Sequence, residues 1–297
     1  MPFQFCLNGI VLPFRERLGL NVTIRSVLMQ QICETHTMTP AELELRRYAV
    51  QGLVAEAGRM ALDYFGKQES LGVTMKGAQD WLTVADGAVE DFLRARLAVL
   101  FPTDTVIGEE GGGAASDAVW IIDPIDGTSN FARGDRNWCI SIGFLRNHVP
   151  TIGIVAAPAL DELYVAQRGQ GATLNGRGIA VSGAEDIKRA YVELGWSTRI
   201  PSERYLAILE RCHAAGCSVK RSGSGTLGLC HVANGRTDAY AELHINAWDV
   251  AAGIVIASEA GASINDFFAG DGIKKGNPIL CCTPALAARL REIAGIS

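Results

Sequence analysis

The pattern of apolar and polar residues predicts two long helices near the start of the folded region. From Thr39 to Gly66, apolar side chains recur at the spacing that places them on one face of a helix. The tetrapeptide Thr39-Pro40-Ala41-Glu42 is a helix start signal, because threonine and glutamate three residues apart can cap each other's backbone. A second amphipathic pattern predicts a helix from Gly87 to Leu100. Residues 1–38 precede the start signal, and we expect them to form an N-terminal extension outside the fold.

Short apolar runs bounded by turns follow, and they predict strands. The expected strands of a first half lie at 73–76, 105–108, 118–122, 138–145, 151–157 and 162–167. Composition becomes polar between Ser182 and Ile187. In a second half, expected strands at 191–194, 217–220 and 238–242 alternate with expected helices at 203–215, 226–234 and 245–260. Alternation of this kind favours a layered α/β fold, which we divide into halves 39–185 and 186–297.

Composition limits the expected partners and location. The chain has 297 residues, of which 48% are hydrophobic and 20% charged, and its formal net charge is −5. The sequence has no basic run and no interleaved arginine and aromatic patch, so nucleic acid is not an expected partner. No uncharged apolar stretch reaches the roughly 18 residues of a transmembrane helix, so no membrane is expected either. The eight cysteines include no Cys-x-x-Cys pair, and we expect reduced thiols in a cytoplasmic protein.

Two acids at the end of the most apolar run are the first candidates for chemistry. The run Ala118–Ile122 predicts a strand buried on both faces, which Asp123 ends and after which Pro124 would prevent further ladder pairing. Asp126 follows, and two carboxylates that leave water together need a counter-charge, which a hard cation would supply. The amides of Gly127-Thr128-Ser129 would open a helix and face an anion beside that cation. Alternatively, Asp123 ends a strand and Asp126 begins a simple Asp-Gly turn.

Other polar residues also admit a purely structural interpretation. Taken alone, Glu109-Glu110 after the strand at 105–108 belongs to a solvated loop. Asp86 is a candidate helix N-cap, with Glu90 on the solvated face of the same helix. Asp249, in the first turn of the last expected helix, would complement the helix dipole. The segment Ser222-Gly223-Ser224-Gly225-Thr226 precedes a helix and suits a second turn that binds an anion or a hydroxyl.

Three motifs together resemble a known family. Asp123-Pro-Ile-Asp-Gly-Thr-Ser-Asn130, after a Trp-Ile-Ile strand, resembles the signature of the inositol monophosphatase family, which comprises magnesium-dependent, lithium-sensitive phosphomonoesterases. Gly108-Glu109-Glu110 and Trp248-Asp249-Val-Ala-Ala-Gly253 match two further family motifs, in the family's order. The resemblance covers roughly Thr39 to the C-terminus. It implies a sandwich of alternating α, β, α, β and α layers.

The resemblance also implies a role for each acid. One Mg²⁺ would bind Glu109, Asp123 and the carbonyl of Ile125, a second would bind Asp123, Asp126 and Asp249, and a third, weaker ion would bind Glu109. Mn²⁺ is an alternative, because the set is all oxygen. Thr128, oriented by Asp86, and Glu109 would position an activated water for in-line attack on the phosphate. The implied contacts to substrate are Asp126, Gly127, Thr128, Ser129, Gly225, Glu242 and Asp249.

The predicted function is therefore hydrolysis of inositol-1-phosphate or a related small polyol phosphate. Glu242 is the main support for inositol, because it matches the family acid that contacts substrate hydroxyls. Histidinol-phosphate, 3′(2′),5′-bisphosphonucleotide and fructose-1,6-bisphosphate phosphatases of the same superfamily are alternatives. An alternative from another class is a regulatory or RNA-associated protein that has kept the fold. Resemblance further implies a homodimer that lithium inhibits.

Overall fold

The computed structural model describes residues 6–7, 10–11, 38–67, 72–77 and 80–297. By packing, the chain divides into two compact units, Met1–Glu42 and Leu43–Ser297. In the first unit, β1 (Cys6–Leu7) pairs antiparallel with β2 (Ile10–Val11). Nearly all the rest of the predicted extension at 1–38 lies outside the described residues. The division of the folded region between residues 185 and 186 stays a prediction.

Both long helices begin with a capping box. In α2 (Pro40–Phe65), the Thr39 amide donates to the Glu42 carboxylate at 2.7 Å, and the Glu42 amide donates to Thr39 Oγ1 at 3.3 Å. In α3 (Val84–Leu100), Thr83 is the N-cap and Asp86 its capping partner, so this helix begins three residues earlier than predicted. The prediction of Asp86 as an N-cap was therefore wrong. The prediction that Glu90 lies on the solvated face of this helix was also wrong, since Glu90 is only 2% exposed.

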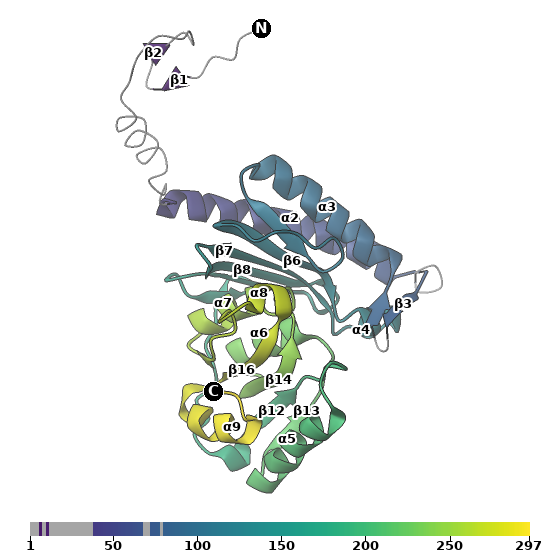
Figure 1. Cartoon of the computed structure of the whole chain (residues 1–297), viewed down its shortest axis with the longest axis vertical. Coiled ribbons are helices and arrows are strands. Elements are labelled where there is room, and N and C mark those ends of the chain that lie inside the picture. The colour runs from purple at the N-terminus through teal and green to yellow at the C-terminus, as the bar shows by residue number, and fades with distance from the viewer. Residues whose placement is uncertain (1–5, 8–9, 12–37, 68–71, 78–79) are drawn as a thin grey trace. The chain divides into compact units, whose positions relative to one another are not determined.

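Among the described residues, seven strands form one sheet, and helices α2 and α3 cover one of its faces (Figure 1). Within it, β5 and β6 are parallel and the other neighbours are antiparallel. All nine residues of β6 are buried, which confirms the buried strand predicted for Ala118–Ile122 and extends it to Asp126. The strands, in their order across the sheet, are β11 (Arg177–Gly178), β10 (Ala172–Leu174), β9 (Glu162–Gln167), β8 (Val149–Ala157), β7 (Cys139–Arg146), β6 (Ala118–Asp126) and β5 (Thr105–Gly108).

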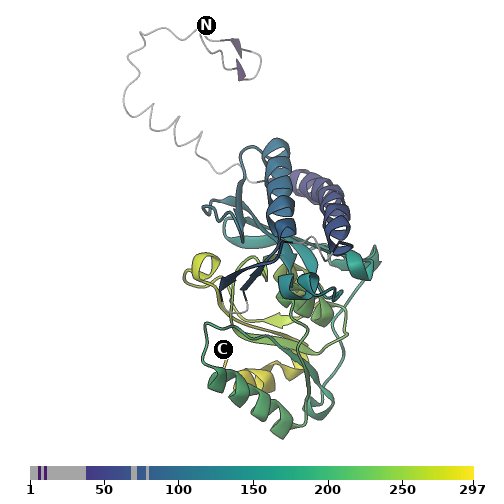
Figure 2. The ribbon, with the colours of Figure 1, turned by 90° about the vertical axis from the view of Figure 1, so that its right-hand side faces the viewer.

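A second, five-stranded sheet carries helices on both of its faces. Helices α6 (Gly225–Ala233) and α7 (Ala251–Glu259) lie between the two sheets, and α5 (Ser202–Ala215) and α9 (Ala287–Ala294) cover the outer face (Figures 1 and 2). The predicted layered α/β sandwich is thus confirmed for the described unit. The strands, in their order across the sheet, are β13 (Ser218–Lys220), β12 (Tyr191–Leu194), β14 (Ala239–Ile245), β16 (Asn277–Cys282) and β15 (Ser263–Ile264).

Smaller elements complete the described unit. The strands β3 (Thr74–Gly77) and β4 (Asp80–Leu82) form a separate antiparallel ladder. The remaining short helices are α4 (Thr128–Ala132), α8 (Gly272–Lys275), η2 (Pro158–Leu160), η3 (Ile187–Arg189) and η4 (Pro284–Leu286).

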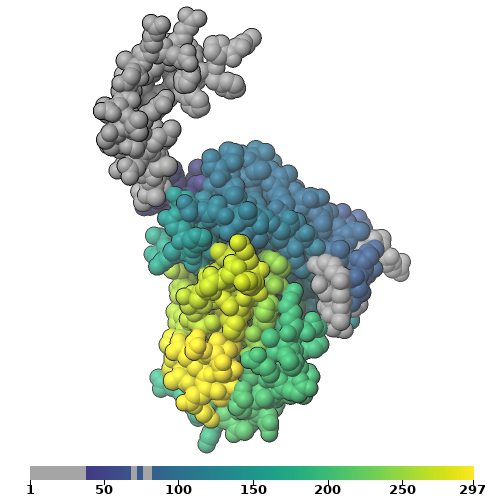
Figure 3. All heavy atoms as spheres, in the orientation of Figure 1, coloured from purple at the N-terminus to yellow at the C-terminus, as the bar shows by residue number. Residues whose placement is uncertain are grey.

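Glycines let α7 lie directly on the seven-stranded sheet. A Cβ at Gly143 of β7 would lie 2.8 Å from the Cβ of Ala251, and one at Gly153 of β8 would lie 2.3 Å from the Ala252 carbonyl oxygen. The backbone of the first turn of α7 therefore packs closely against two strands. On the face shown in Figure 3, the part that contains the seven-stranded sheet packs against the part that contains the five-stranded sheet. This close packing fixes the position of Asp249, which lies two residues before the start of the helix.

Two further observations concern the chain as a whole. Among the described helices, none combines the length and apolar character needed to cross a membrane. The six cysteines for which the structure describes a side chain are all free, in agreement with the expected reduced thiols: Cys139, Cys212, Cys217, Cys230, Cys281 and Cys282.

Candidate metal centre

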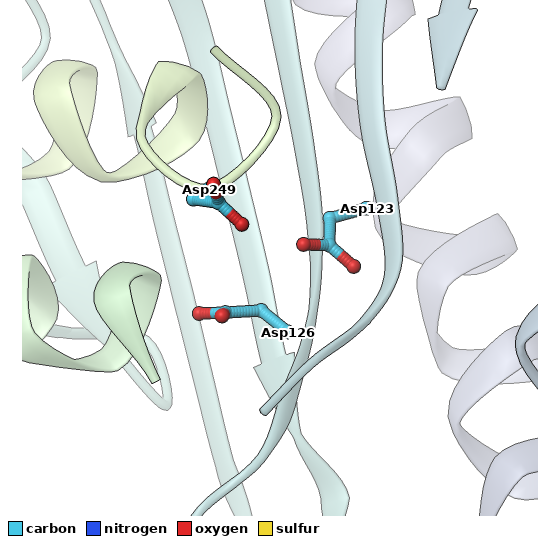
Figure 4. Close-up of side chains that lie close together, drawn as sticks. All are labelled: Asp123, Asp126 and Asp249. Carbon is cyan, nitrogen blue, oxygen red and sulfur yellow. The ribbon is translucent and has the colours of Figure 1, made fainter. Parts of the chain in front are cut away.

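Three carboxylates from two distant segments converge beside the seven-stranded sheet. Asp123 and Asp126 come from β6, and Asp249 comes from the turn between β14 and α7 (Figure 4). One oxygen from each carboxylate can be chosen so that all three lie within 4.8 Å of one another. Asp123 is completely buried and Asp126 nearly so. The prediction that Asp249 lies inside the first turn of a helix was wrong, because α7 begins only at Ala251.

A bulge in β6 explains how two acids three residues apart can share a site. In a regular strand such residues face opposite sides of the sheet. Here Asp123 pairs with Ser141 and Asp126 with Cys139, so three steps along β6 match two steps along β7. The extra residue returns Asp126 to the side of Asp123. The expectation that pairing ends at Pro124 was therefore wrong: proline sits in the bulge, and the ladder resumes after it.

Gathering three acids together, two of them buried and Asp249 half-buried, is electrostatically costly. Burial raises the pKa of Asp123 well above its usual value, and the charges of Glu109, Asp126 and Asp249 raise it further. Burial also raises the pKa of Asp249, with Asp126 and Glu109 as additional causes. Asp123 Oδ1 accepts a hydrogen bond from the Ile125 amide at 2.9 Å, whereas Oδ2 is buried with no hydrogen-bond partner among the described residues.

These observations test whether a metal ion fits. The unpartnered Oδ2 of Asp123 and the mutual repulsion of three carboxylates both call for a cation at this position. All the donor atoms are oxygens, which suits Mg²⁺ or Mn²⁺ and not zinc, whose usual ligands include nitrogen and sulfur. The residues present therefore fit the ion that the sequence resemblance implies.

Asp126 is held in place by the start of α6. Its Oδ2 accepts hydrogen bonds from Ser224 Oγ at 2.6 Å and from the Thr226 amide at 2.7 Å. Ser224 is also the N-cap of α6. The turn at 222–226, predicted to bind an anion or a hydroxyl, thus binds the chain's own carboxylate. The sequence analysis missed Ser224 and Thr226 as partners of Asp126, although serine before a helix is a recognisable N-cap signal.

Asp86 and Thr128 meet beside the three carboxylates. Asp86 Oδ2 accepts from the Thr83 amide at 2.8 Å and from Thr83 Oγ1 at 2.6 Å. Its other oxygen lies 3.1 Å from Thr128 Oγ1, which also lies 3.0 Å from the Ile125 carbonyl oxygen. Burial raises the pKa of Asp86, and the hydrogen bonds from Thr83 oppose this. The geometry agrees with the expected orientation of Thr128 by Asp86, while the catalytic roles of both residues stay predictions.

Backbone geometry beside Thr128 requires glycine. Gly127 has φ 97°, in the left-handed region, and a Cβ there would lie 2.8 Å from the Asn137 carbonyl oxygen. The short helix α4 begins at Thr128, so the amides of Thr128 and Ser129 stand in its first turn, where helical amides lack acceptors within the helix. Together with the amide of Gly127, the N-cap, they are the amides predicted to face the phosphate.

Glu109 is a predicted metal ligand whose carboxylate does not lie among the three that converge. It is half-buried in the turn after β5. Its charge nevertheless contributes to the raised pKa of both Asp123 and Asp249. The charge of Glu110 likewise contributes to the raised pKa of Asp86.

A cleft of about 220 Å³ opens onto Asp126 and Asp249. Its wall includes Glu242, which accepts a hydrogen bond from Tyr240 Oη at 2.6 Å. Burial raises the pKa of Glu242 to about 7, opposed by that hydrogen bond and by the charge of Arg221. The predicted substrate contacts Gly225 and Glu242 thus share one cleft with two of the acids. Further lining residues that the sequence analysis did not identify are Glu193, Trp196 and Arg221.

Comparison with known proteins gives a consistent result. A sequence model of the inositol monophosphatase family matches residues 42–294. An inositol-1-monophosphatase of Rhizobium meliloti is 35% identical over 245 residues, which cover 81% of this chain and 92% of the relative. A protein of Xylella fastidiosa called Nus factor SuhB is 37% identical over 218 residues, which cover 72% of this chain and 79% of the relative.

Solved structures agree with the sequence relatives. The extragenic suppressor protein SuhB of Bartonella henselae superposes with a TM-score of 0.78 at 29% identity, covering 84% of this chain and 98% of the other. An IMPase of Thermotoga maritima superposes with a TM-score of 0.74 at 28% identity, covering 82% and 94% respectively.

Proposed function

This chain belongs to the inositol monophosphatase family, and from that premise we propose that it is a magnesium-dependent phosphomonoesterase acting on inositol-1-phosphate or a related small polyol phosphate. The observation that carries the proposal is the group of Asp123, Asp126 and Asp249 at a cleft. The first two acids are buried and the third is half-buried, and Asp123 Oδ2 has no hydrogen-bond partner among the described residues. An acid cluster that is expensive to bury is retained where it has a ligand to bind.

The chain's own residues divide the work of hydrolysis. Asp123, Asp126, Asp249, Glu109 and the Ile125 carbonyl would hold Mg²⁺, which when bound supplies Lewis acidity and acidifies water. The Thr128 hydroxyl, within hydrogen-bonding distance of Asp86, orients the attacking water toward phosphorus. The first-turn amides of α4 hold the phosphate oxygens, as helix starts commonly do. Because water is the nucleophile, no phosphorylated side chain is required.

Specificity is proposed to come from the other end of the cleft. Glu242 offers carboxylate oxygens to substrate hydroxyls. Gly225 lines the same cleft, and a Cβ there would lie 2.6 Å from Ile245 Cδ1 and displace that lining side chain. A substrate with several adjacent hydroxyls for Glu242 to bind is a polyol phosphate such as inositol-1-phosphate. Histidinol phosphate and a 3′(2′),5′-bisphosphonucleotide remain competing substrates, because Arg221 and Trp196 of the same cleft suit an anionic or planar group.

A second candidate function is a regulatory role in transcription. It is favoured by one observation, namely that several relatives, including the one from Xylella fastidiosa, carry the name Nus factor SuhB. A transcription role and phosphatase activity are not mutually exclusive, so the test must measure hydrolysis itself. We further propose that the protein is a cytoplasmic homodimer. Light scattering on the purified protein would test the oligomeric state.

The deciding experiment is phosphate release by the purified protein with and without Mg²⁺. The substrates are inositol-1-phosphate, histidinol phosphate, a 3′,5′-bisphosphonucleotide and fructose-1,6-bisphosphate, and the Asp123→Asn variant controls for contaminating phosphatases. We expect magnesium-dependent release, fastest from inositol-1-phosphate, and none from the variant. Equal release by both proteins, or none by either, would reject the phosphatase proposal and favour the regulatory one.

A further inference from the structure

We propose that the buried ion pair of Glu90 and Arg94 on α3 positions Glu109 by clamping the turn Gly108–Gly113 in which Glu109 lies. The inference rests on the proposed function, in which Glu109 is a metal ligand. Among the described contacts, Glu90 and Arg94 make none with the three converging carboxylates, and neither residue lines the cleft, so they are positioning residues. Glu109 is delivered by a turn and not by a strand, and a turn needs such support to hold a side chain in one place.

The contacts run directly to the residues that follow Glu109. Glu90 Oε2 accepts the Glu110 amide at 2.9 Å, and Oε1 accepts the Gly111 amide at 2.7 Å. Arg94 Nε donates to Glu90 Oε1 at 2.7 Å. One carboxylate, 2% exposed, therefore binds two consecutive amides of the turn and one guanidinium. Charge-assisted hydrogen bonds of this kind are roughly twice as strong as neutral ones.

Arg94 extends the clamp to both ends of the turn. Its Nη2 donates to the Gly112 carbonyl oxygen at 2.6 Å, and its Nη1 donates to the Val106 carbonyl oxygen of β5 at 3.4 Å. The turn is also closed by its own backbone, because the amides and carbonyls of Gly108 and Gly112 bond reciprocally at 3.0 Å. Glu109 lies inside this closed loop, so its backbone has little freedom to move.

The glycines of the turn are required by the carboxylate that it surrounds. A Cβ at Gly108 would lie 2.6 Å from Glu90 Oε1, and one at Gly111 would lie 2.8 Å from the same atom. Both distances are shorter than any ordinary carbon–oxygen contact, so side chains at either position would displace Glu90. The motif Gly108-Glu109-Glu110-Gly111 is thus built around the Glu90 carboxylate. An ion pair that only stabilised α3 would not need this close approach.

Arg94 also offsets the negative charge that Glu90 brings close to the acids of the metal centre. A lone carboxylate beside this turn would add negative charge near acids that already repel one another. Arg94 neutralises Glu90 across an i, i+4 spacing, so the clamp holds the turn while adding almost no net charge. The amides remain bonded whether or not a cation is present, which keeps Glu109 in place for metal binding.

The test measures metal binding, and not only activity. We would titrate the metal-free full-length protein with Mn²⁺ by calorimetry and record its melting temperature in chelator. Glu90→Gln keeps the shape of the side chain but loses the charge and one acceptor. We expect roughly 10- to 100-fold weaker Mn²⁺ binding, the usual effect of removing a partner that orients a ligand. Arg94→Lys, which keeps the charge but cannot bridge to Gly112 and Val106, should weaken binding less.

Two variants that break other ion pairs of the helices α2 and α3 serve as controls. Arg96→Gln breaks the exposed pair between Arg96 of α3 and Glu56 of α2, and it should change neither Mn²⁺ binding nor the melting temperature. Asp104→Asn breaks a buried pair with Arg46 and a bond from Trp120, so it should lower the melting temperature and leave Mn²⁺ binding unchanged.

Each outcome decides the inference. If Glu90→Gln and Arg94→Lys lower the melting temperature but bind Mn²⁺ as the wild type does, the pair is only structural and the inference fails. If Glu90→Gln does not fold, Arg94→Lys alone decides in the same way. A wild-type protein that binds Mn²⁺ but hydrolyses no phosphate ester overturns the proposed function and leaves the clamp standing. A wild-type protein that binds no divalent cation overturns both.

Discussion

Thr128 Oγ1 lies 3.1 Å from Oδ1 of Asp86, a residue 42 positions earlier in the chain. The other oxygen of Asp86 caps α3 by accepting two hydrogen bonds from Thr83. One buried carboxylate therefore does two things: it fixes the first turn of a core helix, and it orients a hydroxyl beside the candidate metal centre. Asp86 thus supports the helix start as the capping-box partner of Thr83 and not as the N-cap, while its role in catalysis stays a prediction.

Replacing this hydroxyl should slow turnover without unfolding the protein. Thr128→Val keeps the size and β-branching of the side chain but removes the group proposed to orient water. We expect kcat to fall roughly 10²- to 10⁴-fold with KM changed little, because the contribution is made in the transition state. Thr128→Ser, which keeps the hydroxyl, should stay close to wild type. Steady-state kinetics on inositol-1-phosphate would check both, and unchanged kcat in Thr128→Val would remove Thr128 from the mechanism.

Sequence patterns predicted those features that depend on neighbours in the chain. The capping box at Thr39 and the buried strand before Asp123 each follow from a few adjacent residues, and both are observed. The convergence of Asp126 and Asp249 was accessible only through the family resemblance, since no local pattern brings them together.

What the sequence did not reveal depends on packing between distant segments. Glu90 looks like a solvent-facing helical residue until the turn at 108–113 is folded over it. Ser224 binds Asp126 across 98 positions, which no local pattern can indicate. The continuation of β6 beyond Pro124 likewise depends on Cys139 of the neighbouring strand, which pairs with Asp126 after the bulge.

Neutralising Asp123 should abolish turnover and stabilise the metal-free protein. No described residue bonds its buried Oδ2, so Asp123→Asn removes repulsion among the acids while Ile125 keeps its acceptor. The amide nitrogen of the variant can donate to a neighbouring carboxylate. Because an unsatisfied buried polar group costs about 1–3 kcal/mol, we expect a gain of this order in the free energy of unfolding. Melting curves in chelator would show the variant above wild type, whereas adding Mg²⁺ would raise only wild type. A lower melting temperature in chelator would contradict the proposed repulsion.

The buried carboxyl of Glu242 should make stability depend on pH. Its pKa of about 7 lies above the usual 4.5, so the folded state binds this proton more tightly than the unfolded state does. The resulting stability is complete below about pH 4.5 and is lost as pH rises toward 7. Glu242→Gln mimics the protonated form and should lose less stability between pH 5 and pH 8. Denaturant unfolding in chelator at several pH values would check this, and parallel pH curves for the two proteins would contradict it.

The same substitution should separate substrates by the hydroxyls that they carry. Glu242 lines the cleft next to Asp126 and Asp249, yet it is not one of the converging carboxylates. Its proposed task is therefore to accept hydrogen bonds from the substrate ring and not to bind metal. We expect Glu242→Gln to reduce kcat/KM for inositol-1-phosphate far more than for glycerol-2-phosphate, which has no ring. A hydrogen bond to a charged group contributes about 1.5–3 kcal/mol, so the loss should be roughly ten- to hundred-fold.

The pattern of loss across the two substrates distinguishes the possible roles of Glu242. Tyr240→Phe is the matched control, because it removes the donor that holds Glu242 without removing the carboxylate. If Glu242 binds ring hydroxyls, Tyr240→Phe should give a smaller loss with the same preference for glycerol-2-phosphate. A parallel decline for both substrates would instead tie Glu242 to the acids of the metal centre. If neither substrate is affected, the inositol assignment loses its main support, and histidinol phosphate or a bisphosphonucleotide becomes the better candidate, with Arg221 and Trp196 as the residues to test next.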